Sequence, residues 1–316
     1  MTAPPRVQSL AVIIAPGVFV LLWSTGFVGA KYGLPDADPL TLLAIRLALA
    51  AALLAGLAAI RQASWPTPVQ YRQSALAGML LQAGYLGGVF TAISLGVPAS
   101  VTAVVVSLQP VLTAASATRA LREPLRRRQI VGLVAGFAGA ALVLAPGLAA
   151  SVGHPGALPP WGVAACLLAL LTQTLGTLLQ KRDGAQIPLL TGSATQYATA
   201  AVVLLVLDAL VGHPHVHWTG RLVAALAWLV LPLSLGAVLL LFWLLRRGSA
   251  VAVTSLFFLV PPATALEAHL LFGEALTLTF VLGLAISAGG VALVVVAPRR
   301  SGAGWASGQG WGRRST

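Results

Sequence analysis

The chain has 316 residues, of which 58% are apolar and only 8% are charged, and its mean hydropathy is +0.91. Soluble domains carry about 25% charged residues, so this composition excludes a soluble globule and indicates an integral membrane protein. The net charge of +12 does not indicate nucleic-acid binding, because the basic residues stand in short loops between apolar runs, where they act as topology signals. A single cysteine, Cys166, excludes an intramolecular disulfide or a cysteine metal site.

Ten apolar runs are long enough to cross a bilayer, whose core of about 30 Å needs roughly 20 residues per helix. The first run follows one basic residue, Arg6, but it is longer than the core of a secretory signal, so we interpret it as a retained span. The predicted spans are residues 10–30, 40–60, 73–94, 98–118, 128–147, 161–180, 189–211, 222–245, 249–271 and 276–297.

The orientation of these spans follows from the basic residues between them. If the N-terminus is cytoplasmic, the inner segments hold sixteen Lys and Arg residues, and the outer segments hold only Lys31 and Arg221. Cytoplasmic loops are enriched in Lys and Arg, so the sequence predicts that both termini are cytoplasmic and that the protein lies in the cytoplasmic (inner) membrane.

The chain contains an internal repeat. Residues 99–143 align without a gap on residues 250–294, with Pro110 on Pro261 and Glu123 on Glu274, a shift of 151 residues. Five spans per copy place the second copy upside down in the membrane, an arrangement typical of secondary transporters. The predicted fold is therefore an all-α integral membrane protein of ten transmembrane helices in two inverted five-helix repeats. The expected divisions are residues 1–9 (cytoplasmic N-terminus), 10–147 (first repeat), 148–160 (periplasmic connector), 161–298 (second repeat) and 299–316 (disordered cytoplasmic tail).

The two copies resemble a known family. The segment SLQPVLTAASATRALREPL at residues 107–125, its partner FLVPPATALEAHLLFGEAL at residues 258–276, and the early WSTGFVGAKYGL at residues 23–34 are similar to motifs of the EamA-like family of the drug/metabolite transporter superfamily. This resemblance implies a ten-helix transporter that moves amino acids or other small metabolites without ATP. Glu267 and His269 depart from the apolar residues usual at those places.

Pro110 and Pro261 fall inside the fourth and ninth predicted spans. Proline lacks the backbone N–H of a helical hydrogen bond, so each could leave a carbonyl free to bind a substrate amine. Alternatively, each could be a kink that serves packing alone.

Arg46 and Glu267 are ionisable residues inside spans, where such residues are rare and usually functional. Arg46 could hold a substrate carboxylate through two hydrogen bonds, or its long side chain could reach the headgroups instead. Glu267 is the candidate proton-coupling group, because a buried carboxyl can take up a proton near neutral pH.

Aromatic and amide residues inside several spans form the mixture expected of an apolar pocket with a few orienting polar groups, although each could equally serve helix packing. The predicted substrate-binding residues are Trp23, Ser24, Phe27, Arg46, Gln82, Tyr85, Pro110, Gln173, Thr174, Gln196, Trp243 and Pro261.

The sequence lacks GxxxxGK[ST], HExxH and GxSxG, so it predicts no catalytic residue, no metal and no cofactor. His213, His215 and His217 alternate in an outer loop and are interpreted as solvated rather than as a metal site.

We expect a secondary transporter, an exporter coupled to protons, that works by alternating access of the two halves. Its expected partners are a small-molecule substrate and membrane lipid, not nucleic acid, and it is a monomer or homodimer. The alternatives are an integral-membrane enzyme acting on lipid, and a receptor or subunit that does not transport.

Overall fold

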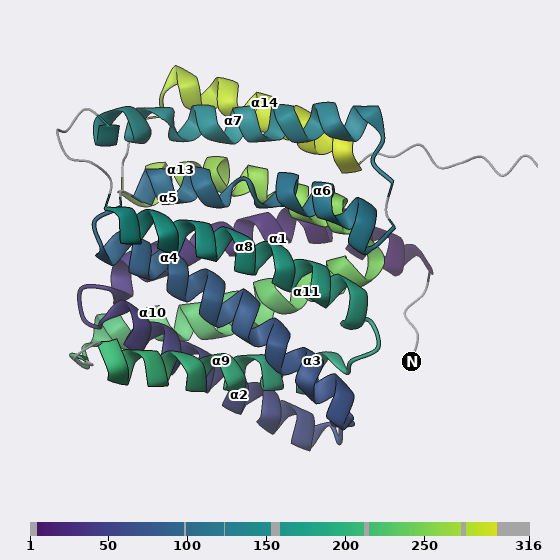
Figure 1. Cartoon of the computed structure of the whole chain (residues 1–316), viewed down its shortest axis with the longest axis vertical. Helices are drawn as coiled ribbons and strands as arrows, with labels where there is room; N and C mark the ends of the chain where they lie inside the picture. The colour runs from purple at the N-terminus through teal and green to yellow at the C-terminus, as the bar shows by residue number, and fades with distance from the viewer. Residues whose placement is uncertain are drawn as a thin grey trace, which may run out of the picture.

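Helices contain most of the residues that the computed structural model describes, which are residues 5–97, 99–122, 124–152, 159–211, 215–272 and 276–295. Their axes run roughly parallel and they stack in layers, with α7 and α14 at one side of the stack and α2 and α9 at the other (Figure 1). The uninterrupted helices are α1 (Pro5–Gly33), α2 (Pro39–Ile60), α7 (Arg127–Val152), α8 (Pro160–Asp183), α9 (Leu189–Val211) and α14 (Leu278–Val295). The four interrupted spans are α3 (Pro68–Gly78), η1 (Met79–Gly84) and α4 (Tyr85–Ser94); α5 (Ala99–Val106) and α6 (Gln109–Ala120); α10 (Gly220–Trp228), η2 (Leu229–Ala237) and α11 (Val238–Arg247); and α12 (Ala250–Ser255), η3 (Leu256–Leu259) and α13 (Val260–Phe272).

Nine spans among the described residues are long and apolar enough to cross a membrane, and α1 adds a shorter apolar segment, Ile14–Gly26. This confirms the prediction of ten helices. Most ends fall within a few residues of the predicted ones. The third span begins earlier, at Pro68, because Thr67 and Gln70 form a reciprocal capping box there, and its polar first turn does not count as an apolar run. α7 continues to Val152, into the stretch expected as a connector.

The irregular turns and interruptions of the helices also occur at matching positions in the two halves. Wide π-helical turns begin at Met79 in the third span and at Leu229 in the eighth, 150 residues apart. The fourth span is interrupted just before Pro110 and the ninth just before Pro261. Pro232 lies inside η2, and the N–H it lacks helps to explain the wide turn there. Matching interruptions are what a duplicated unit predicts.

Helix packing follows the same symmetry. α2 packs on its repeat mate α9, and α7 packs on its mate α14. The pair α1 and α13 matches the pair α8 and α6, and the pair η1 and α8 matches the pair η2 and α1. The two halves are therefore interleaved rather than placed side by side as separate domains.

The α7–α14 pair depends on glycine. A Cβ added at Gly139 would lie 2.4 Å from the backbone nitrogen of Ser287 and 2.6 Å from the carbonyl oxygen of Gly283. Gly290, its repeat mate, meets the backbone of Gly132 and Gly136 as closely. Small residues let two backbones approach within a membrane, so this interface needs glycine on both helices.

Substituting Gly139 by leucine is expected to lower the unfolding temperature in detergent, because both neighbouring groups are backbone and cannot turn away. Overpacking of this kind costs about 1–3 kcal/mol. Gly289→Leu is the matched control, since a Cβ at Gly289 meets nothing within 4 Å. Equal unfolding temperatures for the two variants would contradict the close packing of α7 on α14.

Two loops are joined at the end of the bundle where α1 ends. Ala37 and Val216 form an isolated antiparallel bridge, and Arg221 Nε donates to Asp36 Oδ2 at 2.8 Å. This guanidinium lowers the pKa of the Asp36 carboxyl. His215 and His217 contact each other edge to face, whereas His213 lies outside the described residues.

Candidate substrate cavity

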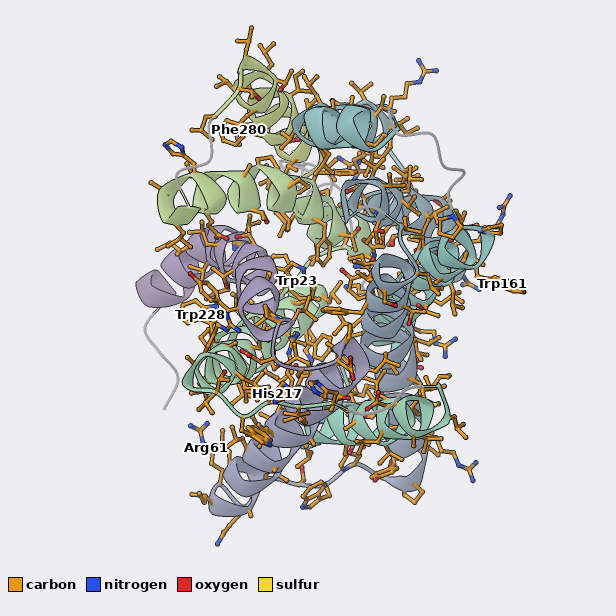
Figure 2. All side chains as sticks on the ribbon, turned by 90° about the vertical axis from the view of Figure 1, so that its left-hand side faces the viewer. Trp23, Arg61, Trp161, His217, Trp228 and Phe280 are labelled. Carbon is orange, nitrogen blue, oxygen red and sulfur yellow. The ribbon has the colours of Figure 1, made fainter. Side chains whose placement is uncertain are left out.

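A cavity of about 390 Å³ lies between the helices, lined by residues of α1, α4, α5, α6, α7, α8, η3 and α13. Such a volume falls within the range typical of small-molecule sites. Figure 2 looks along the helices toward it, with Trp23 near the middle of the bundle and Trp161 pointing away at the outer edge. The residues that give the cavity its chemistry are Trp23, Tyr85, Thr102, Ser107, Gln109, Gln173, Phe257 and Thr264.

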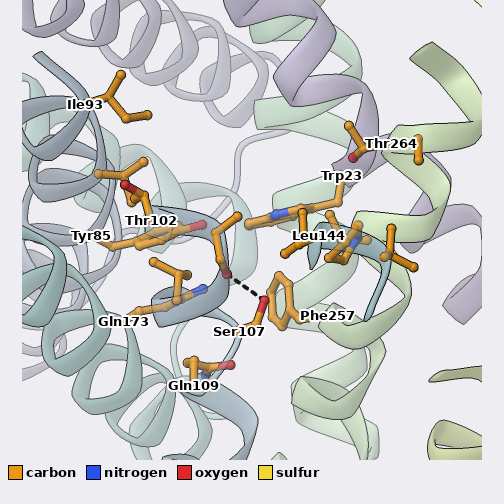
Figure 3. A pocket seen from close by; sticks show the side chains of 17 residues that line it. Trp23, Tyr85, Ile93, Thr102, Ser107, Gln109, Leu144, Gln173, Phe257 and Thr264 are labelled. Atoms are coloured by element: carbon orange, nitrogen blue, oxygen red, sulfur yellow. Dashed lines mark hydrogen bonds between the residues drawn. The ribbon is translucent and has the colours of Figure 1, made fainter. Parts of the chain in front are cut away.

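The aromatic part of the wall comes from three helices. Trp23 of α1 and Phe257 of η3 pack edge to face with ring centroids 5.1 Å apart, and Tyr85 faces them from α4 (Figure 3). Phe19 supports the pair from behind, 5.4 Å from each ring. Edge-to-face contacts hold aromatic rings in fixed orientations, so this wall is preformed.

Helical spacing explains why distant residues reach the same space. Tyr85, Val89 and Ile93 recur every four residues and share one face of α4. On the ninth span, Phe257, Pro261 and Thr264 are spaced by four and then three residues, which also places them on one helix face. The spacing therefore turns two helix faces toward one cavity.

The polar groups at the cavity are only partly paired. Gln109 Nε2 donates to Thr113 Oγ1 at 3.0 Å and to Thr177 Oγ1 at 3.3 Å, which leaves Gln109 Oε1 without a partner. Gln173 Oε1 and Thr264 Oγ1 are also buried without a partner. Ser107 instead donates to the carbonyl of Ala103 within its own helix (Figure 3). All three of these oxygens are buried with almost no accessible surface, so they lie within the wall and do not face the cavity.

The sequence suggested that each proline leaves a backbone carbonyl free, and in the ninth span the structure differs. In the ninth span, the backbone N–H of Val260 donates to the carbonyl of Phe257. The tighter 3₁₀ turn before Pro261 therefore supplies the partner that the proline removes, and this carbonyl is not free. In the fourth span, the carbonyl that Pro110 leaves without its helical donor is that of Val106, and the N–H of Leu108 donates to the neighbouring carbonyl of Val105.

The cavity lies toward one end of the bundle, which we call the open end: the end where α4 finishes and α5 begins. At the opposite, closed end, α12 packs against α6 and α11 packs against α8. The repeat-related pairs at the open end, α5 with α13 and α4 with α1, show no comparable packing among the described residues. The helices of the two halves therefore match, but helix contacts in the described part of the chain close only one end of the bundle.

A second, much smaller space of about 20 Å³ lies beside the cavity, toward the closed end. Trp23, Tyr85, Gln173 and Phe257 line both spaces, so these four side chains form the partition between them. Leu241 and Phe242 of α11 close the far wall of the smaller space.

Lys181 ties the closed end together. Its Nζ donates to the carbonyl of Leu245 at 2.8 Å and to that of Gly248, at the end of α11. The last carbonyls of a helix have no partner within it, so a cation there is stabilising. Lys181 thus joins the end of α8 to the end of α11.

Glu267 lies outside the cavity lining, on α13, one turn from Thr264. Its Oε1 accepts a hydrogen bond from Ser24 of α1, while Oε2 is buried without a partner. The carboxyl group therefore sits at the contact between α1 and α13, next to the cavity wall.

Arg46 is buried, with 6% of its surface exposed, and Nε donates to Ser234 Oγ at 2.9 Å. Ser234 Oγ donates in turn to the carbonyl of Leu229, and Tyr197 donates to the carbonyl of Ser234. The side chain does not reach toward the headgroups. It supports the wide turn η2, whose carbonyls these contacts satisfy.

The predicted substrate-binding residues fall into three groups. Trp23, Tyr85, Gln173 and Pro261 line the cavity, and Gln82 lines the smaller space. The side chain of Phe27 lies outside the described part of the chain. The others line neither space and make contacts between or within helices: Ser24 with Glu267, Arg46 with Ser234, Thr174 with the carbonyl of Leu170, Gln196 with Gln180, Trp243 beneath the Arg247 guanidinium, and Pro110 buried at the start of α6.

Sequence reasoning did not include Thr102, Ser107, Gln109, Phe257 or Thr264 among the candidates. A signal for Gln109 existed, because it directly precedes Pro110 in the repeated motif. Phe257 also matches Val106 at the shift of 151 residues, and both line the cavity. Positions around the repeated prolines were therefore better indicators than isolated polar residues.

Comparison with known proteins agrees with this architecture. The profile of the EamA-like transporter family matches residues 10–145 and 160–296. The uncharacterized transporter YvbV of Bacillus subtilis (strain 168) is 28% identical over 284 residues, 87% of this chain and 88% of YvbV. The uncharacterized inner membrane transporter YedA of Escherichia coli (strain K12) is 25% identical over 279 residues, again 87% and 88%. One crystal structure shares the fold with a TM-score of 0.72 at 19% identity, covering 89% of this chain and 96% of that chain.

Proposed function

Because the chain belongs to the EamA-like transporter family, we propose that it is a secondary transporter that carries a small metabolite, an amino acid or a related compound, by alternating access at the central cavity. The observation that carries this proposal is the asymmetric closure of a symmetric fold. The family consists of transporters, so the alternative of an enzyme acting on lipid falls away. The chain is a multi-pass membrane protein.

Alternating access needs two states that expose one site to opposite sides. Here α12 packs on α6 while the matching pair α13 and α5 stays apart. In the opposite state, α13 would pack on α5 and α12 would separate from α6. The open end would then be closed and the closed end open, around the same cavity. The partition formed by Trp23, Tyr85, Gln173 and Phe257 would then lie on the solute's path.

We place the protein in the cytoplasmic membrane with both termini inside, since the basic residues favour that orientation. The open end then faces the periplasm. The direction proposed is export, driven by proton entry. Glu267 supports the proton coupling, because its carboxyl group lies where α13 meets α1 and holds one oxygen without a partner.

Replacing Glu267 by glutamine is expected to uncouple transport from protons without abolishing exchange. Proteoliposomes are loaded with isotope-labelled amino acids and the corresponding amines, and release is followed with and without an inward proton gradient. Wild-type release should accelerate with the gradient, whereas Glu267→Gln should show the same exchange and no acceleration, because its amide cannot take up the proton.

Asp208→Asn is the matched control. Asp208 is also a buried acid in a span, but it accepts a hydrogen bond from Thr41 at 2.6 Å in the α2–α9 interface, away from the cavity. Gradient-driven release that survives in Glu267→Gln would remove Glu267 as the coupling group. Absence of any release from wild-type liposomes would count against the transport proposal itself.

A further inference from the structure

We propose that the closed end of the bundle binds an anionic phospholipid, with the headgroup on the loop from α6 to α7 and the acyl chains along the exposed face of α7. This inference does not depend on which solute the cavity takes. The loop lies at the right of the bundle in Figure 1, where α6 ends and α7 begins. The headgroup site, called the basic patch, consists of Arg119, Arg122, Arg126, Arg127 and Arg128.

The basic patch concentrates charge that the repeated fold does not require. Five arginines stand within ten residues, and the one acid in that stretch of sequence is Glu123. The matching stretch of the second half, residues 270–279, joins the matching helices α13 and α14 and contains no Lys or Arg. The same connection therefore forms without arginine. Clusters of about four to eight basic residues beside a membrane span attract anionic headgroups.

The basic patch also differs from the other basic residues at the ends of α8 and α11, which are engaged with protein. Those contacts are Lys181 with the carbonyls of Leu245 and Gly248, Arg182 with Asp183, Arg246 with the carbonyl of Ile187, and Arg247 with the ring of Trp243. Within the patch, Arg119, Arg122, Arg126 and Arg127 are exposed, and no ion pair joins them to an acid among the residues that the structure describes. A topology signal needs only the charge, whereas exposed guanidinium groups can also bind phosphate oxygens.

Backbone and amide contacts hold the start of α7, which leaves arginine side chains available. The N–H of Arg126 donates to Gln129 Oε1 at 3.0 Å, and the N–H of Gln129 donates to the carbonyl of Arg126 at 2.9 Å. Arg128 Nε donates to the carbonyl of Leu293 at 3.0 Å and so joins this turn to α14. The guanidinium groups of Arg126 and Arg127 take no part in these contacts and can therefore receive a headgroup.

An exposed apolar stripe on α7 continues from the basic patch. Ile130, Val131 and Val134 follow Arg127 by three, four and seven residues, the spacing of one helix face. Their exposed fractions are 48%, 58% and 64%, whereas Gly139 on another face packs closely on α14. A phospholipid has the same order of groups, a charged phosphate followed by apolar chains. Free phosphate would match only the arginines.

Lipid binding to the full chain in detergent is measured by native mass spectrometry, in titrations with phosphatidylglycerol and with phosphatidylcholine of the same acyl chains. Phosphatidylglycerol should bind about tenfold more tightly or more, because each basic residue near an anionic lipid strengthens binding several-fold. Replacing Arg126 and Arg127 together by glutamine should weaken phosphatidylglycerol binding about tenfold or more and leave phosphatidylcholine binding unchanged. Glycerol 3-phosphate should not displace the lipid, because it has no chains to contact the stripe.

The matched control is the double variant Arg61→Gln with Arg72→Gln. Arg61 and Arg72 are also exposed and flank the connection from α2 to α3, outside the basic patch, so the control removes the same charge. It should retain phosphatidylglycerol binding, and both double variants should keep the wild-type unfolding temperature without added lipid. Equal affinities for the two lipids, equal losses in the two double variants, or displacement of phosphatidylglycerol by an equal concentration of glycerol 3-phosphate overturns the inference.

Discussion

Transport by the Ala103→Phe variant is expected to fall close to background while the protein remains folded. Ala103 lines the cavity from α5, and its carbonyl already accepts a hydrogen bond from Ser107 at 2.7 Å, which fixes this turn of the helix. A phenyl ring at this position has to occupy part of the 390 Å³ in which the solute would bind. Steric crowding of about 1–3 kcal/mol would weaken solute binding roughly 5- to 150-fold.

Ala115→Phe provides the comparison. Ala115 lies on α6, the other half of the same span, and its side chain is exposed on the surface of the bundle. Both variants are purified, compared by unfolding temperature and gel filtration, and assayed for exchange in proteoliposomes. Normal exchange by Ala103→Phe would show that the solute passes elsewhere. Loss of exchange in both variants would point to a general effect of the added ring.

The fold was predictable because it depends on features that recur along the chain. Apolar length gave the spans, and the match of Glu123 to Glu274 gave the repeat without knowledge of any contact. Gly139 and Gly290 match each other at the same shift of 151 residues, and both make close backbone contacts between α7 and α14. Bilayer thickness and backbone satisfaction leave few alternatives for such a sequence.

The cavity was less predictable, because a polar residue inside a span can be satisfied by a neighbouring helix as readily as by a solute. Gln196 and Gln173 are the same residue type at similar depth, yet Gln196 pairs with Gln180 and only Gln173 lines the cavity. The difference depends on how the helices rotate against each other. Arg46 likewise supports the wide turn η2, which no simple sequence pattern announces.

The asymmetry between the two ends was invisible in the sequence for a more basic reason. Because the two halves repeat each other, the state closed at one end and the state closed at the other end have similar free energies. The state that the protein adopts therefore depends on small differences between matching contacts. Lys181 is one such contact, because it binds the carbonyls of Leu245 and Gly248 at the closed end. Its counterpart in the first half is Lys31, 150 residues earlier.

Lys181→Met is therefore expected to shift the protein toward the opposite closure. Hydrogen bonds to a charged group contribute about 1.5–3 kcal/mol, which corresponds to roughly a 10- to 150-fold change in the balance of the two states. Spin labels on cysteines replacing Leu95 and Leu270, both exposed near the open end, would report the change in a background without Cys166. The distance between the labels should shorten in Lys181→Met, because closing this end brings α4 and α13 together.

Arg182→Met is the control on the same turn. The Arg182 side chain is 63% exposed and pairs only with its neighbour Asp183, so removing it leaves the contact between α8 and α11 intact. Unchanged distances in Lys181→Met, or the same change in Arg182→Met, would show that Lys181 does not hold the closed end. Because Lys31 takes the matching position in the first half, the symmetry of the chain predicts that Lys31→Met shifts the distances in the opposite direction.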